Sequence, residues 1–305
     1  MKKYALFAVF CFVIAALSSA QNKFIVIPEN PRPGEPITIG TNADIKEALL
    51  FVNGKQLAKS AFFAVPVENE KQKVMAAVIT IPSTAGHGDA VLWLRNEASV
   101  TYIPISIAPR DFVSEVIKLD PVNTGIRTDA SPRRTEESNL LWTILSSTGN
   151  RVYHTGRFIT PVTSTRRTSF FGDRRVFQYS NGASDTSIHA GVDIGVPTGT
   201  RVVACGSGRI VLARERIVTG FTVIIEHAPG VYSLYYHLDS INVVENAVVE
   251  TGSLIGLSGS TGLSTGPHLH WELRVSAENT DPDIYVTRPI IDKDLIISKL
   301  YDEGP

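Results

Sequence analysis

Two short stretches that lie far apart in the sequence have to meet in space, and this requirement limits how the chain can fold. The first runs from His189 to Asp193 in the pattern H-x-x-x-D, and the second is His268-Leu269-His270. Side chains repeat every two residues along a β-strand, so His268 and His270 are expected on one face. Imidazole nitrogens and a carboxylate at these spacings are suited to binding a metal ion. The pattern therefore predicts that the two stretches lie close together and share a metal site.

The predicted metal ligands are two histidines and one aspartate: His189, Asp193 and His270. Three such ligands with a fourth position left for water are typical of a catalytic zinc site, not of a closed structural one. Zinc lowers the pKa of its water towards about 7, and hydrolysis also needs a proton shuttle and a group that stabilises the oxyanion. The candidates for these roles are His268, on the same strand face as a ligand, and His237, at the end of the apolar run 231–237.

The segment around these residues, 156–290, alternates short apolar runs with glycine-containing turns. The predicted strands cover residues 201–204, 208–214, 221–226, 231–237, 253–257 and 268–275. A parallel βαβ domain is excluded because the sequence has no long helical patterns here. The glycine-rich run 256–262 allows the backbone to approach closely and turn sharply next to a site.

The preceding part of the chain predicts a second β domain. Residues 21–107 hold several short strands at regular spacing, with an Asn53-Gly54 hairpin signal, which is typical of a small β-sandwich of immunoglobulin-like shape. Residues 108–155 are predicted to be a linker with helices over 111–119 and 136–147 and a polar stretch between them. Residues 291–305 form a predicted C-terminal tail. The expected fold class is all-β with a partly helical linker.

The N-terminus predicts export. Lys2 and Lys3 precede an apolar run over 4–17, and small residues end the segment at Ala20, a pattern typical of a secretory signal peptide over residues 1–20. The alternative is an uncleaved membrane anchor, which is the one membrane attachment that the sequence offers. The expected location is the periplasm or the cell envelope. Cleavage would leave Cys205 as the one cysteine, so we expect no intrachain disulfide and a small core residue at that position.

Length and charge narrow the class of protein further. A chain of 305 residues suggests two domains. The formal net charge of −1 gives no sign of the basic stripe that nucleic-acid binding requires. No nucleic-acid partner is therefore expected.

The second half of the chain resembles the M23 family of zinc metallopeptidases, the lysostaphin- and LytM-type peptidoglycan endopeptidases. The resemblance extends over residues 160–285 and is carried by Thr168-Ser169-Phe170-Phe171-Gly172, by His189 with Asp193, by Tyr235-Tyr236-His237-Leu238, by Gly259-Ser260-Thr261-Gly262, and by Thr265-Gly266-Pro267-His268-Leu269-His270-Trp271-Glu272. It implies an antiparallel β catalytic domain of LytM type and Zn²⁺ bound by His189, Asp193 and His270. It also implies that His237 and His268 are the catalytic residues and that the substrate is a peptide cross-link of peptidoglycan.

Two functions remain open on this basis. The first is a zinc-dependent peptidoglycan endopeptidase, which the five matching positions favour. The alternative is a non-catalytic LytM-type module that binds cell wall or activates an amidase. The role of the first domain, as an inhibitor, a targeting unit or a docking unit, also stays open. Glu272 shares the strand face of His270, so it either accepts a hydrogen bond from this ligand and orients it or belongs to an ordinary cross-strand ion pair.

Overall fold

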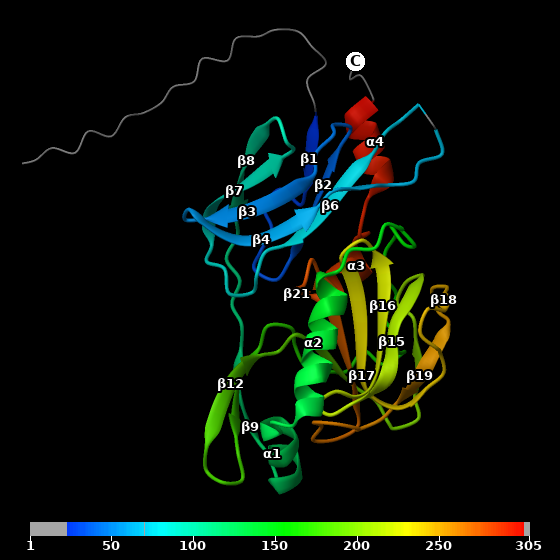
Figure 1. Ribbon diagram of the computed structural model, residues 1–305. Helices are drawn as coiled ribbons and strands as arrows, with labels where there is room; N and C mark the ends of the chain where they lie inside the picture. Colours follow the sequence, from blue (N-terminus) through cyan, green and yellow to red (C-terminus); the bar gives the residue numbers. More distant parts are fainter. Residues whose placement is uncertain (1–22, 70, 302–305) are drawn as a thin grey trace, which may run out of the picture.

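The computed structural model describes residues 23–69 and 71–301, which form a mostly β protein (Figure 1). The predicted signal peptide, residues 1–20, lies outside the described residues. Within the part of the chain that is described, no helix has the length and apolar character needed to span a membrane. Cys205 is fully buried and unpaired, as expected of a core residue.

Two four-stranded antiparallel sheets make up the N-terminal unit, in the orders β1-β2-β6-β5 and β4-β3-β7-β8. Their strands are β1 (Phe24–Ile27), β2 (Pro36–Thr41), β3 (Glu47–Val52), β4 (Lys55–Ala61), β5 (Phe63–Ala64), β6 (Met75–Thr80), β7 (Gly88–Arg95) and β8 (Val100–Ile107). Both sheets contribute to one hydrophobic core, in which Ile37 and Ile79 of one sheet and Leu50 of the other are fully buried. The strands that the sequence predicts here are confirmed.

The middle of the chain differs from the prediction. The expected helix over 111–119 is wrong, because this stretch forms β9 (Ser114–Lys118) and pairs in parallel with β11 (Arg174–Gln178). Together with β12 (Ser184–Ile188) these strands form a three-stranded sheet. The β-branched Val116 and Ile117 favour a strand, and pairing with a distant segment outweighs the weak local preference for helix.

Two helices follow β9. Helix α1 (Pro121–Thr128) lies within the stretch expected to be merely polar, and the Asp120 side chain caps it by accepting a hydrogen bond from the Asn123 amide. Helix α2 (Pro132–Ser146) begins earlier than predicted, because Ser131 caps it and Pro132 suits the first helical position. Leu145 of α2 packs on the face of the large sheet described next (Figure 1).

The C-terminal part is built on a ten-stranded antiparallel sheet with the main path β10-β13-β20-β17-β16-β15-β18. Its strands are β10 (Arg167–Ser169), β13 (Gly191–Gly195), β14 (Arg201–Val203), β15 (Gly208–Arg216), β16 (Gly220–Ala228), β17 (Val231–Ile241), β18 (Val248–Val249), β19 (Leu254–Ser258), β20 (His268–Val275) and β21 (Glu278–Thr280). The predicted strands between residues 201 and 275 are confirmed, although β17 continues past His237. In this order β13, β20 and β17 are neighbours, and they carry most of the predicted site residues.

The N- and C-terminal units share a hydrophobic core. Val65, Val74 and Val78 of the first unit belong to the same buried cluster as Trp271 of β20. The predicted C-terminal tail contains helix α4 (Lys293–Tyr301), which follows the short helix α3 (Pro282–Thr287) and lies against β1 and β2 (Figure 1). The two units are therefore packed against each other and not merely tethered.

A substitution at Gly191 tests how closely β13 must approach β20. A Cβ atom at this position would lie 2.2 Å from the carbonyl oxygen of Trp271. We expect Gly191→Ala to lower the free energy of unfolding by about 1–3 kcal/mol, the usual cost of overpacking. Urea denaturation measures this loss. Gly266→Ala is the control, because nothing lies within 4 Å of its added Cβ; an equal loss in both variants would contradict the close approach.

Candidate metal centre

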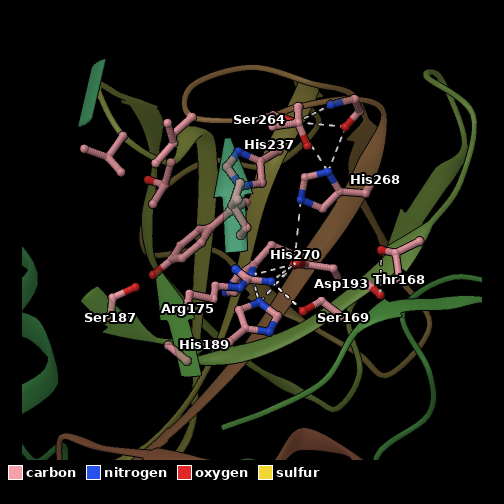
Figure 2. Close-up of a pocket in the computed structure, with 18 of the residues that line it drawn as sticks. Thr168, Ser169, Arg175, Ser187, His189, Asp193, His237, Ser264, His268 and His270 are labelled. Carbon is pink, nitrogen blue, oxygen red and sulfur yellow. Dashed lines mark hydrogen bonds and ion pairs between the residues drawn. The ribbon is translucent and has the colours of Figure 1, made fainter. Parts of the chain in front are cut away.

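The pairing of β13 with β20 places Asp193 directly opposite His270. Residues opposite each other in an antiparallel pair point to the same face, and His268, two residues along β20, shares that face. His189 comes from the turn between β12 and β13. Figure 2 shows the side chains of His189, Asp193 and His270 converging from these elements. The structure thus brings together the two stretches that the sequence separates.

The distances within this group fit a metal ion. His189 Nε2 lies 3.1 Å from Asp193 Oδ1 and 3.1 Å from His270 Nδ1, and the latter two atoms are 2.9 Å apart. A tetrahedral ion with bonds of about 2.0–2.1 Å separates neighbouring ligand atoms by about 3.3 Å. One nitrogen or oxygen from each residue therefore lies close to where a divalent cation would need it, and all three residues are buried.

Each histidine of this group has one ring nitrogen directed to the common point. His189 Nδ1 lies 2.7 Å from the Phe170 carbonyl oxygen and donates to it, which leaves Nε2 without a proton. On the other side, His270 Nε2 lies 3.4 Å from Glu272 Oε2, so Nδ1 is the free nitrogen. Glu272 also pairs with Arg274. The predicted contact of Glu272 with His270 is present, whereas its ion pair is with Arg274 on the same strand and not across strands. Such partners fix the tautomer and orientation of metal-binding histidines.

The electrostatic surroundings favour a positive charge at this point. Burial acts to raise the pKa of Asp193, but the adjacent His189 and His270 rings hold it well below its ordinary value. Burial likewise acts to raise the pKa of Glu272, and the nearby Arg274 and His270 lower it to about 2. Two ionised carboxylates therefore contact His270, and the buried donor set suits a divalent cation.

A bulge in β17 aims His237 into the cleft. The four residues of β17 from Tyr235 to Leu238 lie opposite only three on β16, from Phe221 to Val223, so one extra residue is inserted here. His237 has a φ of 61°, in the left-handed region that few non-glycine residues adopt. Bulges often redirect a side chain next to a functional site. The sequence predicts His237 at a strand end, whereas the structure places it at a bulge within the strand.

The glycine-rich loop before β20 fixes both non-ligand histidines. The Thr261 carbonyl oxygen accepts a hydrogen bond from His237 Nδ1 at 2.7 Å, and the Gly266 carbonyl accepts from His268 Nδ1 at 2.8 Å. Each ring therefore keeps its Nε2 free for the cleft. The ring centroids are 4.8 Å apart, and His268 Nε2 is 3.7 Å from Asp193 Oδ1. The pair stands beside the candidate metal position without replacing a ligand.

A second group of contacts reaches the centre from outside the predicted site. Arg175 donates to Asp193 Oδ2 at 2.8 Å and to Glu115 at 2.6 Å, and Ser169 bridges them (Figure 2 shows Arg175, Ser169 and Asp193). From the sequence alone, Arg175 fits a cleft-lining residue and a solvated loop residue equally well, and nothing singles out Glu115. The position of Glu115 depends on the pairing of β9 with β11, so no local signal could have found it.

The centre lies in a cleft of about 560 Å³. One wall carries Glu115, Ile117, Leu119 and Arg127, which all come from the segment between the two units. Among the described residues, no side chain before Glu115 lines this cleft. The N-terminal sheets therefore support the cleft without entering it.

Comparison with known proteins agrees with this arrangement of fold and site. Residues 187–282 match the model of Peptidase family M23. A relative described as peptidoglycan DD-endopeptidase ShyA, from Vibrio cholerae, is 44% identical over 87 residues, which is 28% of this chain and 20% of that protein. A second, described as DD-carboxypeptidase/endopeptidase Mpg from Neisseria meningitidis, is 42% identical over 95 residues, 31% of this chain and 22% of that protein. Residues 187–282 are thus similar to M23 peptidases, and the chain spans about a fifth of the length of these relatives.

The overall fold also has a counterpart among solved structures. A structure described as a peptidase M23 from Pseudomonas aeruginosa aligns with a TM-score of 0.55 and 22% sequence identity, over 84% of this chain and 94% of that chain. At this identity the match concerns the fold alone. It extends well beyond residues 187–282, so a large part of the N-terminal unit is included.

Metal binding at this centre is expected to weaken as the pH falls. In the metal-free protein burial acts to lower the pKa of His270, but hydrogen bonds with Asp193 and Glu272 raise it to about 9. His270 therefore carries a proton at neutral pH that a metal ion has to displace. The Kd for Zn²⁺, measured by chelator competition, should rise about ten-fold for each unit of acidification if one proton is displaced. A Kd that does not change with pH would contradict this account of the ligands.

Proposed function

We propose that the protein is a zinc-dependent metalloendopeptidase that hydrolyses peptide cross-links of bacterial peptidoglycan. The observation that carries the proposal is the convergence of His189, Asp193 and His270, with His237 and His268 beside them. The N/O donor set and the inward-facing ring nitrogens fit zinc. The description of the Vibrio cholerae relative as a peptidoglycan DD-endopeptidase supports peptidoglycan as the substrate.

The roles of the residues follow from their contacts. A zinc ion held by His189, Asp193 and His270 supplies Lewis acidity that lowers the pKa of a water molecule. Burial, followed by the neighbouring His268 and His270, lowers the pKa of His237 to about 3, so this ring is neutral near pH 7. The free Nε2 atoms of His237 and His268 face the cleft. One ring can accept a proton from the attacking water and pass it to the leaving amine, while the other can stabilise the tetrahedral intermediate by donating to it when its Nε2 carries a proton.

The remaining organisation of the chain belongs to the same proposal. We infer a signal peptide over 1–20, export to the periplasm or cell envelope, and a division into units 21–107, 108–155, 156–290 and 291–305. The two four-stranded sheets with a common core support an immunoglobulin-like sandwich for the first unit. The alternative function, a non-catalytic module, is disfavoured because all five side chains of the proposed site are present and close together.

Two single variants test the proposed division of roles. His189→Ala should lose both bound zinc and activity. His268→Ala should keep zinc but lose at least about 100-fold in activity, because it removes a proton-transfer group. Metal content of the purified proteins and clearing of peptidoglycan in a zymogram are the readouts. Clearing by His189→Ala would contradict the metal assignment, and absence of both zinc and hydrolysis in the unmodified protein would favour the non-catalytic module.

A further inference from the structure

Glu115 and Arg175 are direct neighbours across the parallel pair β9–β11. Glu115 lies outside the segment matched by the M23 model, on the strand between the two units. The register is continuous over five residue pairs, from Ser114 opposite Arg174 to Lys118 opposite Gln178. A shift by one residue would turn Glu115 to the other face of the strand. Its position beside Arg175 is therefore fixed by strand pairing and does not depend on a flexible loop.

The Arg175 guanidinium group is held between two carboxylates. Its Nε donates to Glu115 Oε1 at 2.6 Å and its Nη2 to Asp193 Oδ2 at 2.8 Å, and only 14% of the side chain is exposed. Nη2 also lies 2.6 Å from Ser169 Oγ, which in turn lies 3.0 Å from Glu115 Oε1. Planar guanidinium groups form such multiple, directional hydrogen bonds with carboxylates. Asp193 thus has Oδ2 occupied by Arg175 and Oδ1 turned to His189 and His270.

The charges explain why a second carboxylate is needed. Asp193 is the one anionic member of the candidate ligand set, and an unbalanced cation at its Oδ2 would compete with a metal ion for its negative charge. Glu115 balances Arg175, so Arg175 can orient Asp193 without adding net positive charge beside the metal position. Removing one partner of a largely buried charged network leaves the other uncompensated, and this is costly.

From this geometry we propose that Glu115 is a positioning residue of the metal centre. Acting through Arg175, it keeps Asp193 Oδ1 directed at the metal position and limits the positive charge there. The metal site is then complete only while β9 is paired with β11, so the segment between the two units is part of the active centre. This inference rests on the proposed function, since it assumes that the centre binds a divalent metal.

Cobalt binding by the full chain tests this role without relying on hydrolysis. Metal-free protein is titrated with Co²⁺ against a chelator, and the visible absorption of the bound ion is recorded. Glu115→Gln should weaken Co²⁺ binding by about ten-fold or more, the usual cost of losing a residue that supports a metal ligand, and should change the absorption spectrum. Glu136→Gln, the same substitution at an exposed position of α2, should change neither.

A double-mutant cycle separates this role from a merely structural one. In an Arg175→Met background, Glu115→Gln should weaken Co²⁺ binding by less than about three-fold, because coupled residues are not additive. Equal effects in both backgrounds, or unchanged binding in Glu115→Gln, would overturn the inference. If Glu115→Gln does not fold, Glu115→Asp, which keeps the charge and shortens the reach, takes its place with the same expected outcomes. Failure of the unmodified protein to bind Co²⁺ would instead contradict the proposed function.

Discussion

The antiparallel register between β13 and β20 is the constraint on which the site depends. It sets Asp193 opposite His270 and Gly191 opposite Glu272. Two of the three candidate ligands, and the carboxylate that contacts His270, therefore lie on neighbouring strands. The absence of a Cβ at Gly191 allows the two strands to approach closely. Since side chains alternate along a strand, a shift of the register by one residue would turn Asp193 away from His270 and separate the candidate metal ligands. His189 can then join from the adjacent turn, where Phe170 fixes its ring.

Around this pair the backbone supplies most of the orientation. The carbonyl groups of Phe170, Thr261 and Gly266 accept hydrogen bonds from three different histidines, which sets the tautomer of each ring. The bulge at His237 adds a further residue to the cleft that regular strand alternation would not supply. Rigid elements thus hold the five side chains, and such preorganisation is what hydrolysis around a metal ion requires. From the other side, β9 and β11 hold Asp193 through Glu115 and Arg175.

The sequence predicted the strands well because alternating apolar residues and glycine turns are local signals. It also identified all five histidine and aspartate positions that the structure brings together, since their spacing and context are distinctive. It could not predict β9, because a stretch such as 111–119 has no strong local preference and its strand state depends on pairing with β11. For the same reason Glu115 went unrecognised. The sequence could not predict the bulge at His237 either, because the bulge is defined by the register between β16 and β17 and not by any single residue.

The central claim is that the converging histidines and aspartate bind zinc and that the bound ion supports hydrolysis of peptidoglycan peptides. The most direct measurement is metal analysis of the purified protein combined with digestion of a defined cross-linked muropeptide, before and after chelation. The account predicts one zinc ion per chain, cleavage of the cross-link, loss of cleavage on chelation and recovery on adding zinc. A protein that binds no metal, or that cleaves the muropeptide equally well after the metal is removed, would contradict it.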